Sequence, residues 1–257
     1  MVGYGLIGKK IGHSYSARYL NEIFKENGID AKYNLYPIDD ISHIKRLIET
    51  HKELQGLNVT IPYKSSVIPL LDHISKDAEA IGAVNVIKIR RQEDFSEDGG
   101  NYVLTGYNTD WKAFSESIRP VLSQDMKSAL ILGTGGSSKA VGYALGLTGI
   151  SSIFVSREAE KKNKSIINYE DLTPELLSKN FLIINTTPSG MFPDVNSAPP
   201  IPYEALTPDH LCYDLIYNPE MTEFMKRSLQ KGATVKNGLE MLYRQADLSL
   251  EIWEKAE

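Results

Sequence analysis

Cysteine is nearly absent from this sequence, since Cys212 is the only one among 257 residues. A single cysteine excludes a disulfide framework and a cysteine-based metal site, and it is typical of proteins kept in a reducing compartment. No apolar run reaches the roughly 18 residues that a membrane span needs. The N-terminus also lacks the basic-then-apolar pattern of a signal peptide. These absences predict a soluble, cytoplasmic globular protein without a bound metal.

An excess of positive charge is lacking as well, because 28 basic side chains face 33 acidic ones and the net charge is −5. Proteins that wrap nucleic acid or bind anionic membranes usually carry a basic face. We therefore expect a small-molecule partner, and neither nucleic acid nor a membrane. The length leaves room for one large domain or two small ones, as a monomer or a homodimer.

Strand-like and helix-like stretches alternate along most of the chain, which predicts an α/β fold with parallel sheets. The first third has the pattern of a βαβαβ unit, with strands expected over 4–7, 33–37 and 56–62 and helices over 16–27 and after Asp39 or Asp40. A second unit begins near Ser128, with strands expected over 129–132, 152–155, 181–184 and 211–216 and a helix over 137–147.

Composition also predicts the structure of the segments around these units. Residues 90–100 are charged and end in Asp-Gly-Gly, which predicts an exposed turn. Residues 191–210 are rich in proline and predict a surface loop. Helices are expected after residues 108–110 and after 237–238, and the second of them carries one apolar stripe.

A glycine-rich turn, residues 133–136, lies between an apolar strand and a helix of the second unit. Glycines at this junction let the backbone approach a pyrophosphate, whose charge is stabilised by N–H groups at the start of the helix. Ser138 stands at the third glycine position of the GxGxxG pattern, and a turn that binds nothing is the structural alternative. The position at a strand–helix junction favours dinucleotide binding.

The residues after the next strand discriminate between the two nicotinamide cofactors. NAD sites usually have a carboxylate there, but this strand ends in Ser156 and Arg157. A guanidinium suits the 2′-phosphate of NADP, so NADP is expected rather than NAD. Glu158 opposes this interpretation because its carboxylate competes for the guanidinium or repels the phosphate. A solvated surface arginine is the alternative.

Polar residues interrupt the strand expected over 56–62. Asn58 and Thr60 alternate with apolar residues, so both are expected on one side of the strand. Lys64 follows at the strand's end, where open α/β sheets bind ligands. A lysine whose pKa is lowered toward neutrality can act as acid or base, and an exposed lysine after a turn is the alternative.

Two helix starts carry more capping residues than one helix needs. Asn108, Thr109 and Asp110 precede one helix, and Ser14 and Ser16 precede another that Ser16 is expected to cap. The surplus hydroxyl, amide and carboxylate groups, together with Lys64, suit a small polyhydroxylated acid.

Taken together, eight motifs resemble those of the shikimate dehydrogenase family, in the same order along nearly the whole chain: residues 13–16, 58–64, 82–85, 108–110, 133–140, 185–191, 213–219 and 237–242. The resemblance implies an NADP-linked, reversible reduction of 3-dehydroshikimate to shikimate, in the chorismate route to aromatic amino acids. We therefore expect an α/β substrate-binding domain over 1–107 and 238–257, to which the C-terminal helix returns. A Rossmann-like, doubly wound NADP-binding domain is expected over 108–237, with the substrate in the cleft between the two.

The resemblance also implies a role for individual residues. Lys64 would be the acid/base and Asp110 its partner at the reacting oxygen, while Ser14 and Ser16 would hold the substrate carboxylate. The ring hydroxyls would be contacted by Thr60, Asn85, Asp110, Tyr217 and Gln245. The cofactor would be held by Gly133, Gly135, Gly136, Ser137 and Ser138 at the pyrophosphate, by Ser156 and Arg157 at the adenosine phosphate, and by Leu215 and Gly238 along the nicotinamide.

The chain also departs from the family pattern. Ala17 and Leu20 stand where proline and histidine are usual, and Ser156 and Glu158 replace the Asn and Thr that usually flank the arginine. Three alternatives stay open: an enzyme that also takes quinate or prefers NAD, a nucleotide-binding regulator without catalysis, and a lysine-dependent folate dehydrogenase. The serine pair counts against the last of these.

Overall fold

The computed structural model describes residues 1–9, 11–12, 14–91, 102–158 and 165–255. The chain divides into two compact units, the first formed by Met1–Thr109 with Tyr243–Glu257 and the second by Asp110–Leu242. The exposed turn expected over 90–100 lies outside the described residues from position 92 onward, and so does His13 of the first motif.

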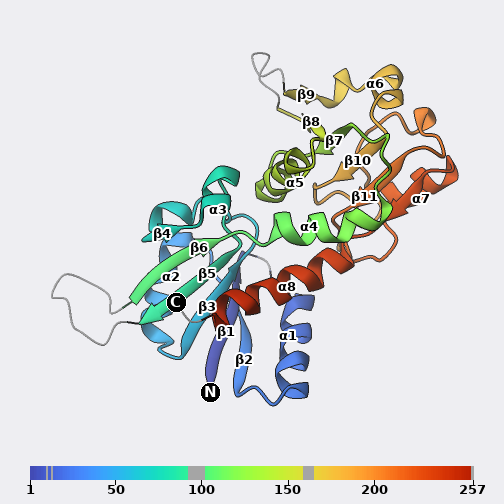
Figure 1. Cartoon of the computed structure of the whole chain (residues 1–257). Helices are drawn as coiled ribbons and strands as arrows, with labels where there is room; N and C mark the ends of the chain where they lie inside the picture. Colours follow the sequence, from blue (N-terminus) through green and yellow to red (C-terminus); the bar gives the residue numbers. More distant parts are fainter. Residues whose placement is uncertain (10, 13, 92–101, 159–164, 256–257) are drawn as a thin grey trace. The chain divides into compact units, whose positions relative to one another are not determined.

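The first unit is built on a six-stranded sheet (Figure 1). Its strands, in spatial order, are β2 (Ala31–Pro37), β1 (Val2–Gly8), β3 (Leu54–Val59), β5 (Val86–Arg91), β6 (Tyr102–Tyr107) and β4 (His73–Ile74). Strand β5 pairs antiparallel with both neighbours, so the prediction of parallel sheets was wrong here. In β5 the buried Ile87 and Ile89 alternate with Lys88 and Arg90, which is typical of an antiparallel strand with one polar face.

Helices cover both faces of this sheet. Helix α2 (Ile44–Thr50) and α3 (Lys76–Ile81) contribute Ile44, Ile48 and Ala78 to the core on one face. On the other face lie α1 (Tyr15–Glu26) and the later turns of α8 (Leu239–Glu254), with Ala246 and Trp253 of the expected apolar stripe in the core. The Trp253 ring stacks on Tyr4 with centroids 4.6 Å apart.

Helices α1 and α8 are also joined by a polar contact. The Tyr19 hydroxyl of α1 donates a 2.8 Å hydrogen bond to Asp247 of α8, and its ring packs 4.4 Å from that of Tyr243. Burial and the hydrogen bond to Asp247 raise the pKa of Tyr19 to about 12, so this hydroxyl stays a donor at physiological pH.

The second unit contains a six-stranded sheet in which every pair is parallel. Its order is β9 (Ile166–Asn168), β8 (Ser151–Ser156), β7 (Ser128–Leu132), β10 (Leu182–Asn185), β11 (Leu211–Asp214) and β12 (Thr234–Lys236). Numbered within the unit this is 3-2-1-4-5-6, the doubly wound dinucleotide-binding order with its reversal between β7 and β10. The predicted fold class is confirmed.

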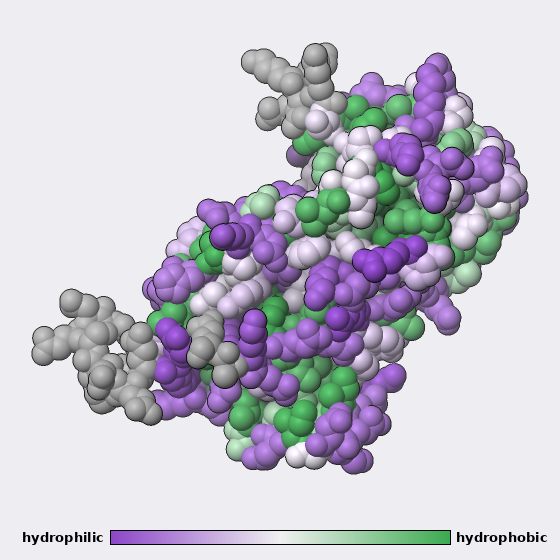
Figure 2. Space-filling view, viewed as in Figure 1, coloured by the Kyte–Doolittle hydropathy of each residue, from purple (hydrophilic) through white to green (hydrophobic). Residues whose placement is uncertain are grey.

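Among the described residues, the second unit contains the helices α4 (Asp110–Ile118), α5 (Gly136–Leu147), α6 (Pro174–Ser178) and α7 (Glu223–Gln230). Within the described residues no helix combines the length and the apolar character needed to cross a bilayer. Figure 2 shows polar side chains over most of one face of the molecule, with hydrophobic residues in separate groups between them.

Candidate active site

Several predicted substrate residues gather at one edge of the first sheet. Strands β1, β3 and β6 end at this edge and the antiparallel β5 begins there, because Asn58 pairs with Val86 and Val86 with Tyr107. Thr60 follows β3 directly, since the strand ends at Val59 and not at residue 62 as expected. The carboxyl ends of strands in an open α/β sheet are where ligands bind.

Asn85 is the centre of a hydrogen-bond network at this edge. It is 1% exposed, and its Nδ2 donates to Thr109 Oγ1 at 2.9 Å and to Gln245 Oε1 at 3.1 Å. Its Oδ1 accepts from the Thr109 backbone N–H at 2.7 Å, and Thr109 Oγ1 donates to the Gln245 backbone oxygen at 3.2 Å. Because Gln245 Oε1 is an acceptor here, its amide nitrogen is the group that can donate to a ligand.

The polar Asn58 has a structural role instead of facing a ligand. Its side chain is 8% exposed, accepts from the Tyr33 hydroxyl at 2.8 Å, and donates to Ser249 Oγ at 2.9 Å and to the Asn85 backbone oxygen at 3.2 Å. These bonds join β2, β3 and α8. The strand expected to carry both Asn58 and Thr60 ends at Val59, so Thr60 lies directly beyond it.

Lys64 is half-buried in the turn that follows β3. Its backbone oxygen accepts from the Val84 N–H at 2.7 Å, which fixes the turn beside the segment that holds Asn85. Asp110 is 2% exposed and is the first residue of α4, directly after Thr109. A carboxylate at a helix N-terminus is stabilised by the N–H groups there. Lys64 belongs to the first unit and Asp110 to the second.

The serine pair lies at the start of α1, with the two residues in reversed roles. Ser14 occupies the N-cap position and Ser16 lies within the first turn, so the expected cap by Ser16 was wrong. The Ser14 side chain makes no capping hydrogen bond. Its hydroxyl is thus not consumed by the helix and can serve a ligand carboxylate.

The glycine turn of the second unit fits a pyrophosphate by two observations. Gly133 has φ +113°, and a methyl group there would lie 2.7 Å from Thr186 Oγ1, so only glycine fits. A methyl group on Gly135 would meet nothing within 4 Å, so packing within the protein does not require this glycine. Gly135 is the N-cap of the 12-residue α5 and supplies no capping side chain. The helix N–H groups that follow, from Gly136 and Ser137 onward, are those that bind anions.

Ser138, at the third glycine position, joins the two strands at which the strand order reverses. Its hydroxyl lies 2.6 Å from Thr186 Oγ1, which donates to the Leu132 backbone oxygen at 2.6 Å. Ser138 is 1% exposed. The Ser138 side chain therefore ties the start of α5 to the residue that follows β10.

The residues expected on the adenosine side, Ser156 and Arg157, lie at the end of β8. Ser156 is its last residue, and its hydroxyl accepts from the Glu158 backbone N–H at 3.2 Å. Arg157 and Glu158 are both exposed. Burial raises the pKa of Tyr169, which follows β9, and the positive charge of Arg157 acts on it in the opposite direction. A guanidinium in this place can bind the 2′-phosphate that distinguishes NADP from NAD.

The residues expected on the nicotinamide side, Leu215 and Gly238, lie close together after β11. Gly238 packs against the backbone of Leu215 so closely that no side chain fits at position 238. The Gly238 N–H donates to the Ile216 oxygen at 3.1 Å, and the Leu215 N–H donates to the Asn185 oxygen at 2.9 Å. Tyr217 follows and is half-buried.

Asp214 is a buried charged residue that the sequence analysis did not single out. It is fully buried at the end of β11, and its carboxylate accepts from Asn185 Nδ2, the Ile216 N–H and Thr222 Oγ1 at 3.0, 3.0 and 2.6 Å. Burial raises the pKa of Asp214 to about 6, against the opposing effect of these hydrogen bonds. An aspartate within an apolar strand, Tyr213-Asp214-Leu215-Ile216, was the available signal.

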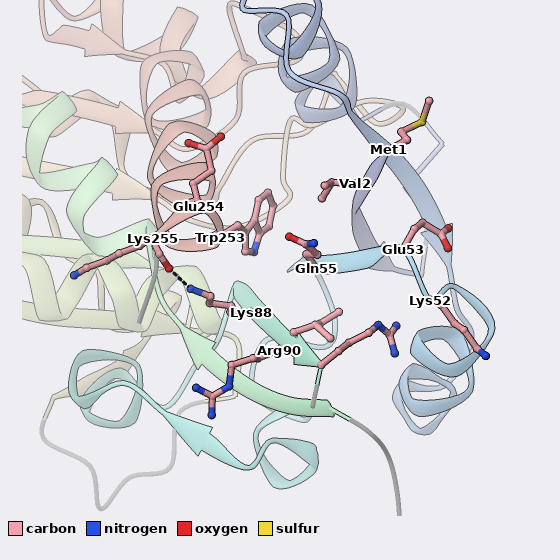
Figure 3. Close-up of a pocket in the computed structure, with 12 residues that line it drawn as sticks. Met1, Val2, Lys52, Glu53, Gln55, Lys88, Arg90, Trp253, Glu254 and Lys255 are labelled. Atoms are coloured by element: carbon pink, nitrogen blue, oxygen red, sulfur yellow. Dashed lines mark hydrogen bonds between the residues drawn. The ribbon is translucent and has the colours of Figure 1, made fainter. Parts of the chain in front are cut away.

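A cavity of about 570 Å³ lies elsewhere (Figure 3). It borders the opposite edge of the first sheet, around Val2, Gln55 and Trp253, and contains none of the predicted site residues. Two of its cations have structural partners: Lys88 Nζ donates to the Lys255 oxygen after α8, and Arg91 donates to the Ile48 and His51 oxygens at the end of α2. Cations at helix C-termini are stabilising, so these charges need no ligand.

Comparison with known proteins gives the relatives of this chain. The family model described as "Shikimate dehydrogenase substrate binding domain" matches residues 6–87, within the first unit. A Clostridium perfringens protein named shikimate dehydrogenase (NADP(+)) is 36% identical over 261 residues, which cover 97% of this chain and 91% of that protein.

Two solved structures are similar over the whole chain. Shikimate dehydrogenase 1 from Peptoclostridium difficile has a TM-score of 0.83 at 35% identity, covering 100% of this chain and 94% of that one. The Thermus thermophilus shikimate 5-dehydrogenase in complex with NADP(H) and shikimate has a TM-score of 0.80 at 26% identity, covering 99% and 94%.

Proposed function

The chain belongs to the shikimate dehydrogenase family, and on that premise we propose that it reduces 3-dehydroshikimate to shikimate with NADPH, with Lys64 and Asp110 at the reacting oxygen. The substrate would bind to the first unit and the cofactor to the second. The observation that carries the proposal is the network around Asn85. It holds Thr109, the residue before Asp110, while the neighbouring Val84 holds the backbone of Lys64.

The proton transfer would be the task of Lys64. As an ammonium it donates a proton to the carbonyl oxygen during reduction, and as an amine it accepts that proton back from the hydroxyl during oxidation. The carboxylate of Asp110 would accept a hydrogen bond from the hydroxyl of shikimate and so orient the reacting oxygen, whereas the ketone oxygen would bind the Lys64 ammonium. The bond from Val84 uses the backbone oxygen of Lys64 and so fixes the chain at this position.

Substrate orientation would depend on neutral groups. The hydroxyls of Ser14 and Ser16 would donate to the carboxylate at the start of α1, while Thr60, Asn85, Tyr217 and the Gln245 amide would bind ring hydroxyls. Neutral donors bind a carboxylate less strongly than arginine does, but they place no further fixed charge beside Lys64.

The turn between β7 and α5 fits the cofactor by its open glycine position, as described above. Gly133, Gly135, Gly136, Ser137 and Ser138 would hold the pyrophosphate, Ser156 and Arg157 the 2′-phosphate, and Leu215 and Gly238 the nicotinamide face. NADPH, when bound, supplies the hydride for the carbonyl carbon.

The test is a spectrophotometric assay of the purified protein. Shikimate with NADP should give reduced nicotinamide absorbance, and kcat/KM should be higher with NADP than with NAD. An absence of turnover with either cofactor, together with normal NADPH binding, would instead identify a nucleotide-binding protein without this activity.

A second candidate, favoured by the exposed Glu158 beside Arg157, is an enzyme that prefers NAD or also oxidises quinate. Comparing kcat/KM for shikimate and quinate with each cofactor decides between the two. A Glu158→Thr variant that gained strongly in NADP preference would show that the carboxylate opposes the 2′-phosphate.

A further inference from the structure

Asp214 is a buried carboxylate that the proposed reaction does not use. It is fully buried, and so are Asn185 and Thr222, which donate to it. A carboxylate in such a place is costly unless donors surround it. Three donors do so, and they come from three separate segments of the chain.

The first of these segments is the turn after β10. Asn185 donates to Asp214 through Nδ2, while its Oδ1 accepts from both the backbone N–H and the hydroxyl of Thr187, at 3.0 and 2.7 Å. The Asn185 backbone oxygen accepts from the Leu215 N–H. The carboxylate therefore also fixes the turn beside the glycine loop, where Thr186 contacts Ser138.

The other two segments follow β11. The Ile216 N–H donates to Asp214 Oδ1, which folds the chain back over the end of its own strand. Thr222 donates to Oδ2 at 2.6 Å, the short distance typical of a hydroxyl on a carboxylate. The same hydroxyl accepts from the Met225 N–H as the N-cap of α7. Residues 215–222 are thus anchored at both ends by one carboxylate.

We infer that Asp214 is a positioning residue for the cofactor, which holds residues 215–217 against Gly238 so that they form the nicotinamide side of the site. The inference rests on the proposed function for its choice of ligand. The carboxylate is suited to this because both of its oxygens accept, whereas an amide at the same place offers one acceptor and one donor group. In an Asp214→Asn variant, the amide N–H would face the Thr222 hydroxyl. That hydroxyl is itself a donor in the wild type, so the bond between the two side chains would be lost.

The test uses the full chain and follows the intrinsic fluorescence of NADPH during titration, without substrate. Asp214→Asn and Thr222→Val both remove the bond between carboxylate and hydroxyl, while Thr222→Ser keeps the hydroxyl as the matched control. We expect Asp214→Asn and Thr222→Val to raise the NADPH Kd about tenfold, as loss of a hydrogen bond to a charged group would, and Thr222→Ser to bind as the wild type does. The KM for shikimate at saturating NADP should rise less than the NADPH Kd, because Tyr217 is the single predicted substrate residue in the segment that Asp214 positions.

A purely structural role would lower the temperature of unfolding and leave the NADPH Kd unchanged, and that result would overturn the inference. An equal rise in the shikimate KM would overturn it too, because it would indicate general loosening. Should Asp214→Asn fail to fold, the Thr222→Val and Thr222→Ser pair decides alone. A wild-type protein that binds NADPH but does not oxidise shikimate would refute the proposed activity while the comparison of Kd values stands.

Discussion

Each unit has a buried asparagine that holds the loops at the carboxyl ends of its strands: Asn85 in the first and Asn185 in the second. The two differ in the charge of their hydrogen-bond partners. Asn85 bonds to the hydroxyl and backbone of Thr109 and to the amide of Gln245, all neutral groups. Asn185 bonds to the carboxylate of Asp214. These partners of Asn85 do not titrate in the physiological range, whereas the carboxylate of Asp214 gives the second network a pH-dependent stability term.

Replacing Lys64 by alanine should have the largest effect, because it removes the chemistry and leaves both networks in place. We expect kcat to fall by at least ~100-fold, the lower end for general acid–base catalysis, with a smaller change in KM. The Val84 bond survives because it uses the backbone of Lys64. Steady-state kinetics at saturating NADP and shikimate measure the change, with Lys52→Ala as an exposed control. Near-normal turnover would remove Lys64 from the mechanism.

Replacing Asp214 by asparagine makes the second network neutral like the first. Because the folded pKa of about 6 lies above the ordinary value of 3.8, the stability contributed by protonated Asp214 is complete below about pH 4. It is lost as the pH rises through about 6. As the pH rises over that interval, deprotonation of Asp214 should lower the unfolding free energy of the wild type by up to about 3 kcal/mol.

Urea unfolding of the wild type and of the Asp214→Asn variant from pH 4 to 7 measures this contribution. The groups that titrate in both proteins cancel in the difference between the two curves. Parallel curves would mean that the Asp214 carboxyl titrates at its ordinary value despite its burial.

Replacing Asn85 by aspartate is the reverse experiment, since it introduces a charge into the neutral network. The new carboxylate cannot donate to Thr109 Oγ1 or Gln245 Oε1, so the unfolding free energy at pH 7 should fall by about 2 kcal/mol. The KM for shikimate should rise as Gln245 loses its partner. Part of the stability should return at acidic pH. Asn196→Asp, at an exposed turn, is the control, and equal behaviour of the two variants would contradict this role for Asn85.

Removing the Tyr19 hydroxyl should have the smallest effect, and it tests whether the first network depends on the packing of α8. Tyr19→Phe loses the bond to Asp247 and keeps the ring against Tyr243. We expect a loss of about 1 kcal/mol or less by thermal unfolding, with the shikimate KM less than about threefold higher. A rise in the shikimate KM as large as that of Asn85→Asp would show that the contact between α1 and α8 holds Gln245 in place more strongly than Asn85 does.

The sequence predicted what local patterns encode. The strand–glycine turn–helix around Gly133 and the apolar stripe of α8 leave periodic or positional signals, and both elements are present. The charged Arg90 was assigned to an exposed turn although it lies in β5, because an antiparallel strand with one polar face resembles a loop in composition.

The networks could not be predicted from local patterns, because they join residues far apart in the chain. Asn85 and Gln245 are 160 positions apart, and Gln245 entered only through the family resemblance. Asp214 gave a signal as a charge in an apolar strand, but nothing nearby in sequence indicated that Asn185 and Thr222 would surround it.

The contact between Trp253 and the first sheet governs the order in which the protein can fold during synthesis. The Trp253 indole packs over Gly56, where no side chain would fit, and donates to the Ile87 oxygen at 3.0 Å. The first unit thus stays without part of its core until the last turn of α8 leaves the ribosome, whereas the second unit is continuous from Asp110 to Leu242. The part translated first is therefore completed last, and its unfinished apolar face is the surface that needs protection in the nascent chain.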